Sequence, residues 1–308
     1  MTRRGPSVFI LATLSFLAVS LFIYYNYVSD LNTKFKRKLS NENNGICSLL
    51  KEQNPTITLC NGSFPEIPRD VQSIHSSSVF KVKLNQSEYD AQMGMIRQFK
   101  TVCETNDITY FFYGGSLIGS YRHFGMVPWD DDIDILLNVS DKQRFRDSVL
   151  GSKEFTLLEF KENLWKYFKT NRSELLENNR NYMWPFIDIL FYYDDGQTLS
   201  LLWDTVDPLP TFNKNDVFPL SFMPFDIFVV PVPKKPEIVL KIVHGDISLC
   251  VSNIWSHQHE EPLKNTEKVP CSTLYSIYPF VHRADNNGTI REELRIKNET
   301  YMVIERIV

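Results

Sequence analysis

The segment Val127–Ile135 reads VPWDDDIDI and sets four carboxylates within five positions at the start of an apolar run. Because side chains two residues apart share one face of a strand, Asp132 and Asp134 are expected to project together, while the neighbouring isoleucines face the core. We predict a strand over residues 132–139. Acidic groups this close repel one another unless cations, hydrogen bonds or protonation compensate, which favours a bound metal ion. Oxygen ligands alone suit Mg²⁺ or Mn²⁺.

A glycine turn precedes this strand in the sequence. The tetrapeptide Tyr113-Gly114-Gly115-Ser116 ends a β-branched and aromatic run at 108–113, which predicts a buried strand followed by a helix through about residue 123. At the start of that helix, free backbone N–H groups and the positive end of the helix dipole would attract a phosphate, and no side chain would block its approach.

Each of these motifs also has an ordinary interpretation. An Asp-x-Asp pair occurs in solvated loops and calcium sites, and a glycine pair occurs in many tight turns. An EF-hand is disfavoured because hydrophobic residues at 133, 135, 136 and 137 indicate a strand, and its glycine and closing glutamate are misplaced. The combination of the two motifs on successive strands favours a catalytic site.

Asp188 is the expected third carboxylate. It is the one acid in Phe186–Phe191, an otherwise apolar strand in which a buried charge is costly without a partner. A site for two metal ions needs such a group. The alternative is a hydrogen-bonded structural aspartate.

Basic side chains are the candidates for contact with an anionic substrate. Arg122 and His123 shortly precede the acidic run, and either could contact a diphosphate. Lys166 and Lys169 are weaker candidates on another strand. The histidines at 257 and 259 lie beside glutamates, and we assign them to a polar surface loop rather than to a metal cluster.

The rest of the chain predicts a mixed α/β fold. Ser87 and Asp90 form a predicted capping box for a helix with apolar residues on one face, and Ser140 with Gln143 predicts a second helix to about residue 150. Strands are expected at 155–160, 164–169, 185–193, 217–220 and 225–232, a helix at 234–243, and a hairpin within 291–308 around residues 298 and 299.

The N-terminal region indicates the secretory pathway. Residues 8–28 are uncharged and mostly apolar, which predicts one membrane span, with a cleaved signal peptide as the alternative. Flanking charges leave the orientation open. Asn-x-Ser/Thr triplets, which favour a luminal catalytic portion, all follow the span and begin at Asn61, Asn85, Asn138, Asn171, Asn287 and Asn298.

Charge and cysteine content add two constraints. A net charge of -4 provides no basic field for nucleic acid. Five cysteines fit an oxidising compartment and match no common zinc pattern. Their spacing allows pairs 47 with 60 and 250 with 271, and Cys103, on an apolar helix face, is expected to be buried and unpaired.

These observations divide the chain into five parts. We expect a cytosolic N-terminus at 1–7, a signal anchor at 8–28 and a luminal stem at 29–84. A catalytic domain at 85–265 and a C-terminal extension at 266–308, packed on the same domain, follow. The predicted protein is a single-pass type II protein of the Golgi or endoplasmic reticulum membrane.

The motifs together resemble the LicD family, which includes the fukutin-related proteins, within the nucleotidyltransferase superfamily. The resemblance lies in the segments 113–123, 127–135, 184–189, 217–220 and 230–246 and extends over about residues 88–260. It implies a mixed β-sheet with flanking helices, and transfer of a phospho-alcohol, such as phosphocholine or a polyol phosphate, from a CDP-activated donor to a hydroxyl of a glycan or glycoprotein.

The resemblance also implies roles for individual residues. Asp132 and Asp134 would bind metal, and Asp188 would bind metal or act as general base. Residues expected to contact the substrate are Gly114, Gly115, Ser116, Arg122, His123, Trp129 and Asp131. The sequence departs from the family pattern in two ways, and both concern the acceptor pocket. His244 stands where relatives often have an aromatic residue, and the cysteine-rich zinc insertion of some relatives is missing.

Two other functions fit the same motifs. A metal-dependent glycosyltransferase also uses Asp-x-Asp and is often a type II membrane protein. A non-catalytic glycan-binding protein could retain the fold, although the three acids in place argue against it. Nucleotide preference distinguishes these alternatives.

Overall fold

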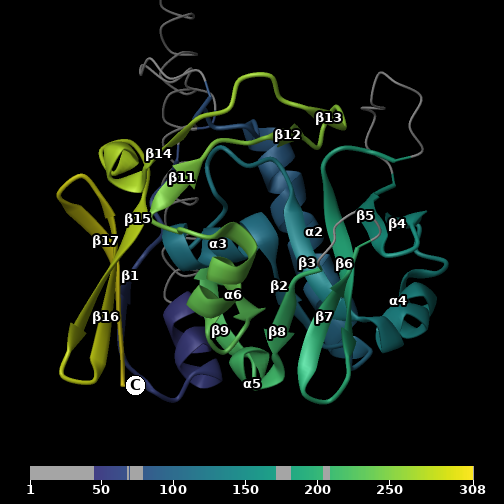
Figure 1. Ribbon diagram of the computed structural model, residues 1–308, viewed down its shortest axis with the longest axis horizontal. Helices are drawn as coiled ribbons and strands as arrows, with labels where there is room; N and C mark the ends of the chain where they lie inside the picture. Colours follow the sequence, from purple (N-terminus) through teal and green to yellow (C-terminus); the bar gives the residue numbers. More distant parts are fainter. Residues whose placement is uncertain (1–44, 68, 70–78, 171–181, 204–208, 308) are drawn as a thin grey trace, which may run out of the picture. The chain divides into compact units, whose positions relative to one another are not determined.

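The computed structural model describes residues 45–67, 69, 79–170, 182–203 and 209–307 of the chain (Figure 1). Residues from Ile46 onward form one compact unit. It has a mixed α and β fold, as the sequence predicts.

The largest sheet has seven strands and carries the predicted motifs. Its central order is β2 (Tyr110–Phe112), β3 (Ile133–Asn138), β6 (Phe186–Asp194), β5 (Leu164–Lys169) and β4 (Phe155–Lys161), and β7 (Thr198–Leu202) pairs with β6 and with β8 (Thr211–Asn213). The β3–β6 pair is parallel, and the other pairs are antiparallel. The parallel pair sets residues 134 and 188 side by side.

Strand β6 lies in the middle of the sheet and is buried over residues 186–192. A strand covered on both faces reads as a continuous apolar run rather than as an alternation, which is the pattern around Asp188. Strands β3 to β6 lie within two residues of their predicted positions.

Helices cover this sheet or join its strands. They are α2 (Gln86–Thr105), α3 (Gly114–His123), α4 (Lys142–Val149), α5 (Lys214–Val217) and α6 (Pro236–His244), with short 3-10 turns at Val139–Asp141 and Cys271–Leu274. The predicted cap of α2 is wrong by two residues, because Asn85 and Glu88 form the capping box. The predicted cap of α4 is also wrong, since Asp141 is its N-cap and makes no side-chain capping bond. Cys103 in α2 is buried and unpaired, as expected.

The region after α5 differs from the prediction. The strand expected at 217–220 is wrong, because α5 ends at Val217 and the next strand, β9 (Ser221–Phe225), begins later. The single strand expected at 225–232 is instead the end of β9, a turn and β10 (Phe228–Val232), which pair as a hairpin. Asp226 in that turn has a φ of 53°.

Residues 250–271 form a closed segment, bounded by the predicted disulfide Cys250–Cys271. It begins in β11 (Leu249–Val251), which pairs with β14 (Lys268–Pro270), and carries the short pair β12 (Trp255–Ser256) and β13 (Glu261–Pro262). In Figure 1 the closed segment, in yellow-green, passes over the upper ends of β3 and β6, and ion pairs join it to residues there. The segment therefore forms one wall of the space above these strands.

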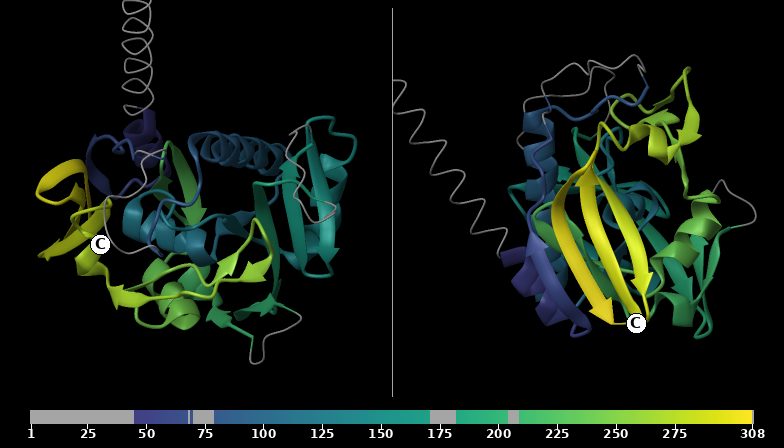
Figure 2. Two further views of the ribbon diagram at one scale, coloured as in Figure 1. Left: turned by 90° about the horizontal axis from the view of Figure 1, so that it is seen from above. Right: turned by 90° about the vertical axis from the view of Figure 1, so that its left-hand side faces the viewer.

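A separate four-stranded sheet contains the C-terminal strands. Its order is β1 (Ile57–Gly62), β17 (Glu299–Ile307), β16 (Thr289–Ile296) and β15 (Phe280–Asn286), and it faces the viewer in the right-hand view of Figure 2. The predicted hairpin of β16 and β17 is confirmed.

The stem predicted to end at residue 84 is too long. Residues 45–53 are helical, β1 pairs with β17, and the predicted disulfide Cys47–Cys60 joins the two elements. The side chains of Ile46 and Leu50 are buried in the main core. These residues were assigned to the stem because they show no sustained hydrophobic period, whereas pairing with the distant C-terminal strand organises them.

Within the described ranges, no helix combines the length and the apolar character required to cross a membrane. The predicted span, residues 8–28, lies outside the described residues.

Candidate functional site

Three carboxylates meet at the start of the parallel strand pair. Asp132 directly precedes β3, Asp134 lies in β3, and Asp188 is its register partner in β6. One oxygen from each lies within 4.8 Å of the others. The structure therefore brings together the three acids that the sequence predicts, although the roles assigned to them remain predictions.

The glycine turn faces this group. The backbone N–H of Gly115 donates to Oδ2 of Asp134 over 3.2 Å, and the backbone N–H of Asp134 donates to the Ser116 hydroxyl over 2.9 Å. Gly114 has a φ of +52°, and a Cβ atom there would collide with the Asp134 carboxylate. A Cβ atom on Gly115 would collide with Asp130. Both positions thus require glycine, because carboxylates occupy the space beside them.

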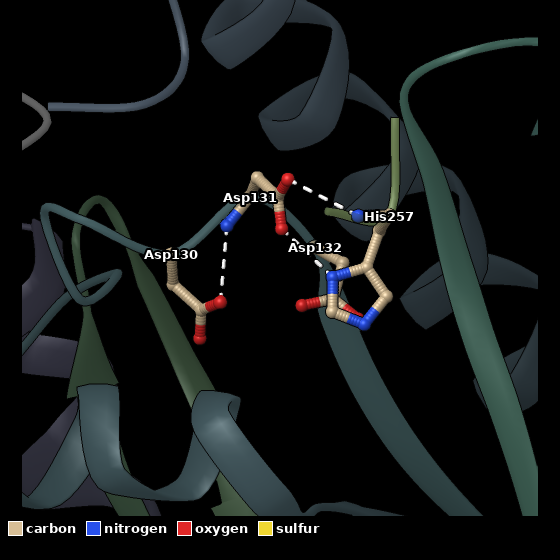
Figure 3. A group of neighbouring side chains, drawn as sticks. All are labelled: Asp130, Asp131, Asp132 and His257. Atoms are coloured by element: carbon tan, nitrogen blue, oxygen red, sulfur yellow. Dashed lines mark hydrogen bonds and ion pairs between the residues drawn. The ribbon is translucent and has the colours of Figure 1, made fainter. Parts of the chain in front are cut away.

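A second acidic group lies beside the first and includes His257, for which the sequence predicts a surface loop. Asp130, Asp131, Asp132 and His257 each offer a ligand atom within 4.8 Å of the others (Figure 3). Nδ1 of His257 lies 2.7 Å from Asp131, and Nε2 lies 3.3 Å from Asp132. The surface-loop assignment is wrong for His257, whereas His259 is exposed. No local pattern could correct it, because the closed segment brings His257 to the acids from 125 residues away.

A buried lysine is the second cation of the site. Lys166 in β5 is 1% exposed, and its Nζ lies 2.9 Å from both Asp188 and Glu260. Glu260, like His257, comes from the closed segment. Lys169, the other lysine considered, pairs at the surface with Glu154 over 3.7 Å.

Burial dominates the electrostatics of these carboxyl groups. It raises the pKa of Asp134 to about 7, with a further contribution from Asp188, and raises the pKa of Asp130 to about 6. Burial also raises the pKa of Asp132 and of Asp188, although Lys166 opposes the rise at Asp188. Burial opposes protonation of His257, but the carboxylates of residues 130–132 outweigh it and raise the pKa of His257 to about 11.

The donor set fits a divalent cation. Six carboxylates, at 130, 131, 132, 134, 188 and 260, share two side-chain cations within the described residues. The raised pKa values of Asp132 and Asp134 show that negative charge is costly here, and a hard cation with oxygen ligands relieves that cost. Asp132 belongs to both groups, so its carboxylate is close enough to bind an ion in either of them.

A cavity of about 380 Å³ adjoins the glycine turn. Gly115 and Asp130 line it at the acidic end. The other lining residues come from α3, from Val127 and Trp129, from the end of α6 with the loop after it, and from the closed segment. Arg122 lines it too, donating to the carbonyls of Ile247 and Leu249. Its guanidinium also donates to Sγ of Cys250.

Two of the residues expected to contact substrate are used in packing. His123 is fully buried between Trp129 and Phe280, and its Nδ1 lies 2.6 Å from the Pro279 carbonyl. Burial lowers the pKa of His123 to about 3, so the ring is neutral. The prediction that His123 contacts substrate is wrong, because helix α3 turns it toward the C-terminal sheet. Trp129 is 2% exposed, and its indole N–H donates to the carbonyl of Val251 in the closed segment.

Asp131 also acts as an anchor for the closed segment. It accepts hydrogen bonds from the side chain of Asn253 and from the backbone and ring of His257. Its oxygens are therefore engaged within the protein, and the substrate contact predicted for Asp131 has no support in this geometry.

The predicted glycosylation sites differ in exposure. Asn61, Asn85, Asn287 and Asn298 are exposed, and Asn138 is half-buried. Asn171 lies outside the described residues.

Comparison with known proteins identifies the central part of the chain. Residues 107–235 match the protein-family model described as LicD/FKTN/FKRP, nucleotidyltransferase domain. These residues include the glycine turn and all three converging carboxylates. The family resemblance noted from the motifs is thereby confirmed.

Two curated relatives support the same grouping. The chain is 44% identical over 55 residues to the lipopolysaccharide cholinephosphotransferase LicD of Haemophilus influenzae, covering 18% of this chain and 21% of that protein. It is 25% identical over 152 residues to the ribitol 5-phosphate transferase FKRP of Mus musculus, covering 47% of this chain and 29% of that protein. The chain thus spans less than a third of either relative.

A solved structure is more distantly similar. The lincosamide antibiotic adenylyltransferase LnuA, in its lincomycin-bound crystal structure, aligns with a TM-score of 0.34 and 13% identity, covering 51% of this chain and 84% of that one.

Proposed function

Because residues 107–235 of this chain form a nucleotidyltransferase domain of the LicD family, we propose that the protein transfers a phospho-alcohol from a CDP-activated donor to a glycan hydroxyl. Phosphocholine and polyol phosphates are the expected groups, in keeping with the names of the two relatives. The observation that carries the proposal is the convergence of Asp132, Asp134 and Asp188 beside the glycine turn.

The acids would hold Mg²⁺ or Mn²⁺. Asp132, Asp134 and Asp188 form one proposed ligand group, and Asp130 and Asp132 contribute to the other. Bound there, the cations would neutralise charge on the donor diphosphate and on the departing CMP. His257 lies against Asp131 and Asp132 and would lower the repulsion between them.

The glycine turn would bind the donor phosphates. The first N–H groups of α3 have no helical partner, and the helix dipole favours an anion at this end. The missing side chains at Gly114 and Gly115 allow the carboxylates of Asp134 and Asp130 to lie against the turn, so a phosphate bound at this helix end would lie beside the proposed cation ligands. The adjoining cavity, with Arg122 in its wall, provides space for the rest of the donor.

Asp188 is the proposed proton acceptor. Lys166 keeps the Asp188 carboxylate oriented for this role through a contact of 2.9 Å. The acceptor hydroxyl would attack the distal phosphorus in line, giving its proton to Asp188 as the bond to CMP breaks. Fixed orientation of the reacting groups would contribute most of the acceleration.

The compartment is part of the same proposal. Two disulfides and several exposed Asn-x-Ser/Thr triplets suit the lumen of the endoplasmic reticulum or Golgi. We propose a type II membrane protein with its catalytic domain in that lumen and the anchor at residues 8–28.

Release of CMP tests the activity. The purified full-length chain is incubated with CDP-choline, CDP-ribitol or CDP-glycerol, a glycan mixture and Mg²⁺, and we expect CMP from at least one donor. Asp134→Asn is the negative control. No release from any donor, together with thermal stabilisation by UDP or GDP sugars only, would replace this proposal with a glycosyltransferase.

A further inference from the structure

Lys166 forms its ion pair with Asp188 in the protein interior, not at the surface. It lies in the register row that joins three neighbouring strands, with Asp134 in β3, Asp188 in β6 and Lys166 in β5. Its Nζ contacts Oδ1 of Asp188 at 2.9 Å. The lysine therefore touches one of the three converging carboxylates from the side opposite Asp134.

The surroundings of the ammonium group are mostly aromatic. Nζ lies 3.6 Å from the centre of the Phe186 ring, and the rings of Tyr182 and Phe160 lie 5.1 and 5.3 Å away. A cation enclosed in this way has lost its water and is stable only with well-placed partners. The side chain is 1% exposed, so its ammonium group has little room to move.

Glu260 supplies the second partner. Its Oε1 lies 2.9 Å from Nζ, and its side chain is 17% exposed. The closed segment that carries it is fixed by the Cys250–Cys271 disulfide and by the bonds from Asn253 and His257 to Asp131. Lys166 is thus held from two directions, by the sheet and by the closed segment.

The consequence concerns the orientation of Asp188. A carboxylate with one oxygen engaged at hydrogen-bond distance cannot rotate freely about its terminal bond, so the direction of its other oxygen is restricted. Groups that bind a ligand residue from outside the site commonly set its orientation in this way. Asp188 would otherwise be the least constrained of the three acids, because its carboxylate has no other hydrogen bond among the described residues.

We propose that Lys166 is a positioning residue for Asp188, and that Glu260 of the closed segment holds Lys166 in that role. The inference rests on the proposed function, because it assigns Asp188 to a cation site. It adds that the geometry of this site depends on a segment outside residues 107–235, the range of the family match.

A comparison of two cations separates positioning from charge. Mg²⁺ requires a near-ideal geometry and Ca²⁺ tolerates a loose one, whereas both have the same charge. Loss of the lysine charge alone would change both affinities equally, so the ratio of the two affinities reports geometry. The affinities are measured on the full-length chain by EPR of free Mn²⁺ in competition with Mg²⁺ or Ca²⁺.

In Lys166→Met we expect the affinity ratio to shift toward Ca²⁺ by about tenfold. Glu260→Gln, which leaves the pair of Lys166 with Asp188 intact, should shift it in the same direction by a smaller factor. Glu261→Gln is the matched control, because this neighbour is exposed and forms no ion pair within the described residues. Its ratio should equal that of the wild type.

An unchanged ratio in both Lys166→Met and Glu260→Gln would overturn the positioning role. If Lys166→Met does not fold, the ratio in Glu260→Gln decides the question. A wild-type chain that binds none of the three ions would overturn the metal-dependent function and this inference together, which distinguishes that failure from an unchanged ratio.

Discussion

Replacing Gly115 with alanine tests the space beside the glycine turn, and Gly94 provides a matched control. Both residues lie in helices, Gly115 in α3 and Gly94 in α2. A Cβ atom at Gly94 meets nothing within 4 Å, whereas one at Gly115 collides with Oδ2 of Asp130 and lies 3.9 Å from Oδ2 of Asp134. The two substitutions therefore make the same chemical change in open and in filled space.

The magnitudes follow from these contacts. Alanine stabilises a helix by about 0.5–1 kcal/mol relative to glycine, so Gly94→Ala should raise the melting temperature by about 1–4 °C. In Gly115→Ala the Asp130 carboxylate must move, and we expect it to lose the bond, 3.0 Å long, that its Oδ1 accepts from the Asp131 backbone. Loss of a hydrogen bond to a charged group costs about 1.5–3 kcal/mol, so this variant should be less stable by about 1–2 kcal/mol.

The effect on turnover should be larger. The added methyl group displaces Asp130, a proposed cation ligand beside the helix end that would bind the donor phosphates, and a displacement of about 1 Å can lower the rate by about 100-fold. CMP release per folded molecule is measured at saturating donor, and the melting temperature is measured on the same samples. Wild-type turnover in Gly115→Ala would refute the assignment of the donor phosphates to this turn, and a loss of turnover in Gly94→Ala would show that the assay reports stability instead.

Three further predictions concern charge, cross-linking and pH. Asp134→Asn should abolish CMP release and raise the melting temperature in EDTA, because repulsion from Asp188 is removed; an unchanged melting temperature would show that this repulsion is compensated. Replacing both Cys250 and Cys271 with alanine should lower the free energy of unfolding in urea by about 3 kcal/mol and remove most of the turnover. Replacing both Cys47 and Cys60 with alanine also opens a short loop, and this variant should lose stability but keep its turnover per folded molecule. Burial raises the pKa of Asp226 to about 6, against the opposing effect of Arg69, so its folded-state pKa exceeds its unfolded value. The native state then binds the proton more tightly, and its stability should fall relative to Asp226→Asn by about 2 kcal/mol between pH 4 and pH 6. If the difference in unfolding free energy between the wild type and Asp226→Asn, measured in urea, does not change with pH, the raised pKa of Asp226 is contradicted.

The local patterns predicted much of the sheet and its acids. Strands β3, β4, β5 and β6 and helix α3 lie close to their expected positions, because their apolar runs and glycine turn are decided by neighbouring residues. The alternation at 132–134 and the lone acid in β6 likewise indicated which carboxylates to examine. The errors at 217–232 arose where a short apolar run could form a strand, a turn or the end of a helix.

Local sequence patterns did not predict the contacts between distant segments. Nothing near His257 or Glu260 indicates that they reach the acids, because the closed segment that carries them is placed by a disulfide and by hydrogen bonds to Asp131. Nor does the neighbourhood of His123 show that its ring packs against the C-terminal sheet.

Amino-acid order alone therefore indicates the three converging acids and the glycine turn, because strand and turn geometry repeats over two to four residues, and the resemblance of these motifs to known ones indicates the family. Packing of the whole chain decides which cations accompany those acids, since Lys166, Glu260 and His257 meet them only after strands and a cross-linked segment from separate parts of the chain come together. It also decides that residues 46–62 belong to the folded unit, because β1 is completed by the last strand. Long-range pairing of this kind leaves no periodic trace in the sequence near either partner.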